Sequence, residues 1–366
     1  MTNGNWLESF LEHLSQTFEI PPEATRNIAV NDTVWALDNT AYRTAEGKWQ
    51  ARFDVVVFGQ DTGNRVVSTV VDVAKMLNIG ISDGSRQLII ERLGLLLQPA
   101  LQGKIVEILF AAQKSSMLRT SPTGSSGISS DIQDLPCFHG IHTVRSVVNA
   151  PSGAKGLLEM TTFFAEPEGW GIISDIDDTI KVTQTASVVG TLRETFAAEP
   201  TPIEGMPELY KYIQDLVTES SPFFYVSASP YTLYVFLHEF CKKYFPQGTI
   251  ILRDICWNNL WSQIIAGTFA YKIDQIDQIF SWLPRRKMIC VGDSTQHDPE
   301  VYAQVCRKYP DWIKLILIRK GTGISTSSDE KQDNGLERFE RAFHDIDNER
   351  WFVFDMPEQC RQVVKR

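Results

Sequence analysis

From Trp170 onward, continuous apolar runs alternate with amphipathic helical segments. The apolar runs are WGIISDI, PFFYVSAS, KMICVG and IKLILIRK, and the segments between them include MPELYKYIQDLV and PEVYAQVCRKY. Buried strands that alternate with helices predict a parallel sheet covered on both faces, because each crossover helix packs on the sheet. We therefore expect residues 169–366 to form an α/β domain with a doubly wound parallel sheet. In such sheets the chemistry lies at the carboxyl ends of the strands.

Residues 1–168 show a different pattern, in which β-branched residues recur with a period of two. The stretch AYRTAEGKWQARFDVVVFG predicts a hairpin that turns at Glu46 and Gly47. Residues 66–98 have a helical pattern, and residues 115–131 are rich in Ser and Gly without periodicity. We predict a mainly β N-terminal domain with a helical insertion and a flexible loop near residues 115–131.

Composition limits the classes of partner. The 366 residues suggest two domains, and the formal net charge of −10 argues against a nucleic-acid binder. The six cysteines form no CxxC pair, which favours reduced thiols, and no lysine or arginine precedes Arg26, as a signal or transit peptide would require. No apolar run approaches the roughly 18 residues of a membrane span. We expect a cytoplasmic protein whose membrane contact is peripheral.

The sequence GIISDIDDTIKV places three aspartates, Asp175, Asp177 and Asp178, directly behind the first apolar strand of the α/β domain. Carboxylates this close repel one another and raise one another's pKa values unless a cation holds them. A calcium loop of the EF-hand type is excluded, because Ile180 and Ala186 stand where that loop needs Gly and Glu. A plain acidic turn is the remaining simple alternative.

Further polar residues follow the other strands of this domain. Ser227 ends the second strand, with Ser229 as the alternative hydroxyl, and Lys272 opens a later helix, with Lys287 as the alternative cation. The loop GDSTQHD, which contains Asp293 and Asp298, follows KMICV. Strand-end residues of one parallel sheet share an edge, so we expect these side chains to form one site.

This set of motifs resembles the haloacid dehalogenase superfamily. ISDIDDTIKVT, YVSASPYTLY and PRRKMICVGDSTQHDPEVY are similar to the catalytic domain of the fungal actin-patch phosphatidate phosphatases. The resemblance is strong over residues 171–319 and weaker in RFERAF and TAYRTAEGKWQARFDVVVFG. It implies a haloacid-dehalogenase-like fold, a hydrolase of phosphoric monoesters, and actin-patch or endocytic partners at membranes or the cell cortex.

The residue types fit phosphoryl transfer, which needs a nucleophile, charge neutralisation and a proton for the leaving group. Asp175 is the candidate nucleophile, and Asp177 is the candidate general acid and base. Ser227 would donate to a phosphoryl oxygen, and Lys272 would offset negative charge. The residues that would hold Mg²⁺ are Asp175, Asp177, Asp293 and Asp298. Asp177 would bind through its backbone carbonyl, and Asp298 would support either the metal or Lys272 without being a direct ligand.

The resulting hypothesis is a Mg²⁺-dependent phosphatidate phosphatase that works through an aspartyl-phosphate. The resemblance adds that Asp at position 177 is the phosphatase pattern, whereas Thr there preserves the phospho-aspartate. Residues 183–205 are too few for a large cap, and an open site with a small cap or none suits a bulky lipid. Two alternatives stay open: a phosphatase of soluble phosphomonoesters or phosphoproteins, and an adaptor whose catalytic domain has decayed.

Overall fold

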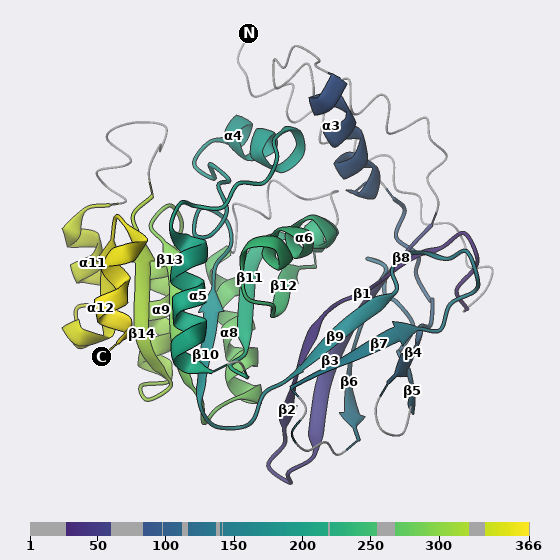
Figure 1. Cartoon of the computed structure of the whole chain (residues 1–366), viewed down its shortest axis with the longest axis horizontal. Helices are drawn as coiled ribbons and strands as arrows, with labels where there is room; N and C mark the ends of the chain where they lie inside the picture. The colour runs from purple at the N-terminus through teal and green to yellow at the C-terminus, as the bar shows by residue number, and fades with distance from the viewer. Residues whose placement is uncertain are drawn as a thin grey trace. The chain divides into compact units, whose positions relative to one another are not determined.

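The computed structural model of the protein describes residues 27–59, 83–96, 98–111, 116–136, 140, 142–218, 220–254, 268–321 and 334–365. The chain divides into two compact units (Figure 1). The first contains residues 1–164, 229–235 and 253–266, and the second contains residues 165–228, 236–252 and 267–366.

The second unit is built on a six-stranded sheet with the order β12-β11-β10-β13-β14-β15. Its strands are β10 (Trp170–Ser174), β11 (Phe223–Pro230), β12 (Thr249–Arg253), β13 (Lys287–Asp293), β14 (Ile313–Arg319) and β15 (Trp351–Phe354). The pairs β10·β11, β10·β13, β13·β14 and β14·β15 are all parallel, as the apolar runs predict. The strands that follow β10 first extend the sheet on one side of it and then on the other, so the order reverses between β10 and β13.

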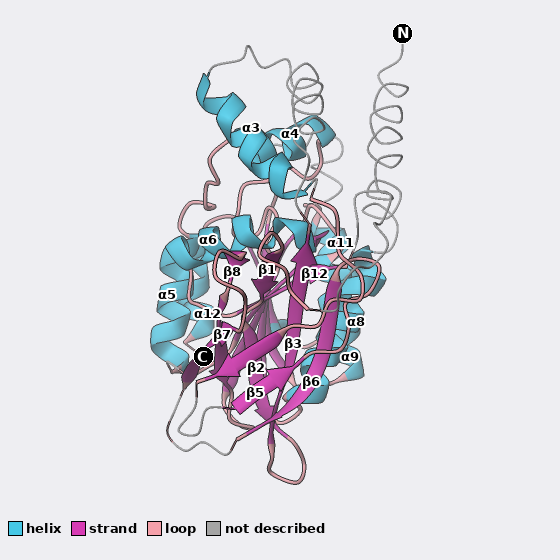
Figure 2. Cartoon of the chain, turned by 90° about the vertical axis from the view of Figure 1, so that its right-hand side faces the viewer, coloured by secondary structure: helices cyan, strands magenta, loops and turns pink. Residues whose placement is uncertain are grey.

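Helices lie on both sides of this sheet. Figure 2 shows α5, α6 and α12 on one side and α8, α9 and α11 on the other. Their bounds are α5 (Met206–Val217), α6 (Tyr234–Tyr244), α8 (Thr268–Trp282), α9 (Asp298–Lys308), α11 (Leu336–Ala342) and α12 (Cys360–Val364). In α5 the buried residues Met206, Leu209, Tyr210, Ile213 and Val217 recur at helical spacing, so one face of the helix packs on the sheet.

The first unit is mainly β. Nine strands form a mixed sheet with the order β5-β4-β7-β9-β2-β3-β1-β8, and β6 pairs with β3. The strands are β1 (Thr33–Ala36), β2 (Asn39–Arg43), β3 (Trp49–Phe58), β4 (Glu107–Phe110), β5 (Ser116–Arg119), β6 (Ile128–Leu135), β7 (Thr143–Val148), β8 (Lys155–Leu157) and β9 (Glu159–Phe164). Hydrophobic side chains from these strands form one buried core, which includes Val34, Phe53, Val55, Ile108 and Phe110.

Local predictions for the first unit have mixed outcomes. The turn between β2 and β3 contains Gly47 with φ of +80°, a conformation that glycine adopts without strain. In the predicted helical insertion, α3 (Asp83–Leu96) is a helix, and residues 60–82 lie outside the described residues. The structure differs near residues 115–131, where β5 and β6 occupy the ends of the expected loop. β5 pairs with β4 and β6 pairs with β3, so these residues form strands that their polar composition does not predict.

The predicted boundary at residues 168–169 lies between β9 and β10, but the first unit also takes residues 229–235, which comprise the last two residues of β11 and the five that follow it. The Tyr231 hydroxyl donates to the Ser126 carbonyl (2.7 Å), and the Tyr234 hydroxyl accepts from the Asp38 N–H (2.9 Å). Among the helices in the described part of the chain, none is both long and apolar enough to cross a membrane.

Candidate active site

The carboxyl ends of β10 and β13 lie side by side and carry two of the predicted aspartates. Asp175 follows β10, and Asp293 is the last residue of β13. Ser174 is paired with Val291, and the Asp175 N–H donates to the Val291 carbonyl (2.9 Å). The strand order reverses at this pair, which is the position where ligands bind in open parallel sheets.

Lys272 reaches this point from α8. Its Nζ lies 2.7 Å from Asp175 Oδ1 and also donates to Asp298 Oδ1, and all three side chains are almost completely buried. Burial alone would lower the pKa of Lys272, but the Asp175 and Asp298 carboxylates outweigh burial and raise it. The lysine is therefore a fixed positive charge beside the candidate nucleophile.

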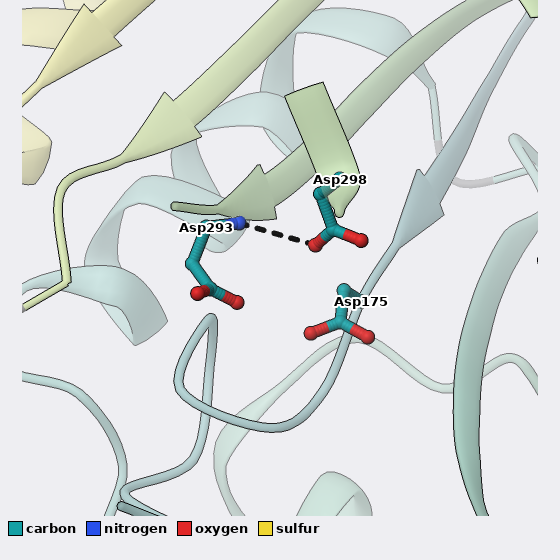
Figure 3. Close-up of side chains that lie close together, drawn as sticks. All are labelled: Asp175, Asp293 and Asp298. Carbon is teal, nitrogen blue, oxygen red and sulfur yellow. Dashed lines mark hydrogen bonds between the residues drawn. The ribbon is translucent and has the colours of Figure 1, made fainter. Parts of the chain in front are cut away.

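Three carboxylates converge here, with ligand oxygens of Asp175, Asp293 and Asp298 all within 4.8 Å of one another (Figure 3). Burial raises the pKa of Asp175 well above its usual range; the Lys272 ammonium opposes the rise, and the neighbouring carboxylates add to it. Burial and Asp298 raise the pKa of Asp293 to about 7. Three carboxylates against one ammonium leave a charge of −2, which a divalent cation would neutralise. The donor set therefore fits Mg²⁺.

Two hydroxyls fix the orientation of these carboxylates. Thr179 Oγ1 lies 3.2 Å from Asp175 Oδ2 and 3.0 Å from Asp293 Oδ2, so it bridges the two strand ends. The Thr295 N–H donates to Asp293 Oδ1 (2.5 Å), as does the Thr295 hydroxyl. Hydrogen bonds to charged oxygens restrict the rotation of the side chain, and both carboxylates are held before any ligand arrives.

Gly292 explains how Asp298 can lie against β13. Asp298 Oδ2 accepts from the backbone N–H of Asp293 at 3.2 Å (Figure 3). A Cβ atom at residue 292 would meet this oxygen at 2.5 Å and Cε2 of Tyr302 at 2.8 Å. Both oxygens of Asp298 are thus used, one by Lys272 and one by the backbone.

Asp177 lies between two hydroxyls. Ser227 Oγ donates to Asp177 Oδ2 (2.7 Å), and Thr183 Oγ1 donates to Asp177 Oδ1 (2.9 Å). The Lys181 ammonium in turn donates to Thr183 Oγ1 (3.0 Å) and to the Val182 carbonyl (3.1 Å). All of these side chains except that of Val182 are buried.

Asp178 organises the turn that follows. Its φ is +57°, a left-handed conformation that Asp tolerates better than most residues. Oδ1 accepts from the N–H groups of Thr183 (2.9 Å) and Gln184 (2.8 Å), and Oδ2 accepts from the N–H (2.7 Å) and hydroxyl (2.6 Å) of Thr185. The Asp178 carbonyl accepts two hydrogen bonds from Arg319 (2.9 and 2.6 Å), which ties the turn to the end of β14.

A second arginine holds the acidic loop from the other side. Arg338, at the start of α11, donates to the carbonyls of Ser294 (2.5 Å) and Gln296 (2.5 Å) and forms an ion pair with Glu300 (2.9 Å). It lies within the RFERAF stretch, which the sequence connects only weakly to the site.

The structure brings together the side chains that the sequence selects at the strand ends, namely those of Asp175, Asp177, Ser227, Lys272, Asp293 and Asp298. The alternative cation Lys287 is exposed and lies over the Trp170 ring (5.7 Å to the centroid). Sequence reasoning did not single out six contributors: Thr179, Lys181, Thr183, Thr295, Arg319 and Arg338. Only Lys181 carries a signal, since a lysine inside the apolar run following DIDDT needs a buried partner.

A comparison with known proteins covers the segment that contains this site. Residues 170–320 match the family model described as phosphatidate phosphatase APP1, catalytic domain. The resemblance predicted from the motifs is confirmed for this segment.

Two relatives extend the comparison. Over 162 residues, or 43% of this chain, the sequence is 36% identical to phosphatidate phosphatase APP1 of Saccharomyces cerevisiae, and the match covers 27% of that protein. Over 222 residues, or 54% of this chain, it is 28% identical to an uncharacterised protein of Schizosaccharomyces pombe, of which 36% is covered. The chain therefore spans well under half the length of the curated relatives it matches.

Proposed function

We propose that the protein is a Mg²⁺-dependent phosphatidate phosphatase with a haloacid-dehalogenase-like catalytic domain. One observation carries the proposal. The segment that matches the catalytic-domain family contains a carboxylate at the switch point of a parallel sheet, in contact with a buried lysine. An adaptor with a decayed site is disfavoured, because a buried charged cluster is costly to retain without a task.

In the first half of the reaction, a carboxylate oxygen of Asp175 attacks phosphorus. The bond from phosphorus to the ester oxygen breaks, and an aspartyl-phosphate forms. Lys272 offsets charge on the nucleophile and on the phosphoryl group as the two negative groups approach.

Asp177 moves the protons in both halves. It donates a proton to the departing alkoxide and later takes one from the water that attacks the aspartyl-phosphate, so that phosphate leaves and Asp175 is restored. Ser227, which now contacts Asp177, would donate its hydroxyl hydrogen to a phosphoryl oxygen.

Mg²⁺ would be held by the carboxylates of Asp175 and Asp293 and by the Asp177 carbonyl, with Asp298 behind them. When bound, it would neutralise charge on the phosphoryl oxygens. The raised pKa values of Asp175 and Asp293 support this assignment, because a protonated Asp175 is a poor nucleophile and a cation would keep it ionised.

Phosphatidate is favoured over soluble substrates by two observations. The curated relative with 36% identity is named as a phosphatidate phosphatase. The helices in residues 183–205 are short, namely α4 (Val188–Leu192) and one π-helical turn (Arg193–Ala197). They are too small to form a large cap that would enclose a small soluble substrate, and a site with a small cap suits a bulky lipid. A lipid substrate would bring the protein to a membrane surface. The cytoplasmic location expected from the composition and the actin-patch location implied by the resemblance stay predictions.

Phosphate release tests the proposal. The full chain is assayed on phosphatidate in detergent micelles and on a panel of water-soluble phosphomonoesters, with Asp175→Asn as the blank. Preference for phosphatidate is expected. Preference for a soluble ester would establish the alternative substrate class, and no release above the Asp175→Asn blank would overturn the enzymatic assignment.

A further inference from the structure

The two oxygens of Asp177 are bound in different ways. Oδ2 accepts from Ser227 in β11, whereas Oδ1 accepts from Thr183, six residues after Asp177 in the chain. Ser227 is one of the residues expected to bind the phosphoryl group. Thr183 has no such task, and its side chain is only 2% exposed.

A serine hydroxyl has one hydrogen to donate. While Ser227 donates to Asp177, that hydrogen cannot also bind a phosphoryl oxygen. Substrate binding therefore requires the hydroxyl to turn from Asp177 to the phosphoryl group. That rotation ends the hydrogen bond from Ser227 to Oδ2, while the hydrogen bond from Thr183 to Oδ1 stays in place.

Lys181 determines which way the Thr183 hydroxyl points. Its ammonium donates to Thr183 Oγ1 (3.0 Å), so that oxygen acts as an acceptor on one side and directs its own hydrogen to the other. The Asp177 oxygen at 2.9 Å is the nearer acceptor, because the Lys181 carbonyl lies 3.4 Å away. A hydroxyl polarised by a cation is also a stronger donor.

From this geometry we propose that Thr183, oriented by Lys181, is a positioning residue that holds Asp177 through Oδ1 when Ser227 turns to the substrate. Oδ2 is then the oxygen that exchanges a proton with the leaving group. The inference rests on the proposed role of Asp177 as general acid.

The test compares substrates whose leaving groups need protonation to different degrees. Thr183→Val removes the hydroxyl at nearly constant shape. We expect its turnover to fall about tenfold on phosphatidate, whose leaving group is an alcohol, and by less than about twofold on 4-nitrophenyl phosphate. Thr183→Ser keeps the hydroxyl and should recover most of the loss. Thr201→Val, an exposed threonine in the following segment, serves as the matched control and should behave as wild type on both substrates.

Lys181→Met is a second variant in case Thr183→Val folds poorly, and it should show the same preference with a smaller loss of about threefold on phosphatidate. Equal losses on the two substrates, or no recovery in Thr183→Ser, would overturn the positioning role. Asp177→Asn separates the two claims. If the activity loss of Asp177→Asn is the same on both substrates, the proposed general acid is wrong. If the loss of Asp177→Asn depends on the leaving group but the losses of Thr183→Val and Lys181→Met do not, only the positioning role of Thr183 is wrong.

Discussion

The ammonium of Lys272 lies 2.7 Å from Oδ1 of Asp175, and neither side chain is more than 3% exposed. Replacing the lysine by methionine leaves buried carboxylates without their cation. We expect Lys272→Met to lower the free energy of unfolding by roughly 3–5 kcal/mol and to abolish measurable phosphate release. Urea unfolding and the phosphate assay measure the two effects. The control is Lys287→Met, at an exposed lysine, which should change the free energy of unfolding by less than about 0.5 kcal/mol. A fully active Lys272→Met would contradict its role.

The carboxylate cluster predicts a pH dependence in the absence of metal. The native pKa of Asp293 is raised to about 7, so the folded protein binds more protons than the unfolded chain between about pH 4 and that value. The free energy of unfolding in EDTA should therefore fall as pH rises through this window. Mg²⁺ competes with the protons, so the stabilisation that it gives should grow over the same window.

Thermal unfolding with EDTA and with Mg²⁺ at several pH values measures both trends. Asp293→Asn removes the titrating group and should flatten the pH dependence of the Mg²⁺ effect. A melting-temperature shift by Mg²⁺ that is the same at pH 5 and pH 8 would argue against a metal at this carboxylate.

Gly292→Ala tests the close approach of Asp298 to β13. The added Cβ would meet the Asp298 carboxylate at 2.5 Å and Tyr302 at 2.8 Å, both in a buried site. We expect a loss of roughly 1–3 kcal/mol in stability and a larger loss of activity, because Asp298 also holds Lys272. At Gly124 the nearest atom to an added Cβ is 3.7 Å away, so Gly124→Ala is the control. Activity retained in Gly292→Ala would show that Asp298 can move without consequence.

Asp178→Asn tests the turn that follows the candidate catalytic residues Asp175 and Asp177. Asparagine tolerates the left-handed φ but replaces one acceptor oxygen by an NH₂ group, so two of the four hydrogen bonds lose their acceptor. We expect a loss of roughly 1–3 kcal/mol and faster amide exchange at residues 183–185. The exposed Asp215→Asn is the control and should have little effect. Unchanged exchange at these amides would show that Asp178 does not order the turn.

The sequence predicts the parallel sheet and its strand-end residues well, because both depend on local patterns. Apolar runs identify β10, β11, β13 and β14, and parallel strands necessarily bring their carboxyl ends together. Local sequence patterns do not predict which side chains contact Asp177. The hydrogen bond from Thr183 depends on the path of one turn, which the Asp178 carboxylate organises and which Arg319, far away in sequence, ties to the end of β14.

The first unit shows the same limit. Residues 115–131 lack any periodicity, yet β5 forms within them and β6 begins in them, because β4 and β3 offer partners. Residues 229–235 continue from a strand of the α/β unit but belong to the β unit, where Tyr231 and Tyr234 form hydrogen bonds. Both outcomes depend on tertiary contacts that composition does not encode.

The reversal of strand order between β10 and β13 has a consequence for synthesis of the chain. The ribosome produces β10, β11 and β12 well before β13, so an incomplete chain that has folded this far leaves β10 as an open edge. β10 is almost entirely buried in the complete protein, so its apolar side chains and free edge would be exposed until β13 is synthesised, and the incomplete chain would be prone to aggregate. The same event that closes the edge delivers Asp293 to Asp175. The proposed metal site can thus form only once the edge of the nascent sheet is covered, and a chain truncated before β13 would have neither the covered edge nor the site.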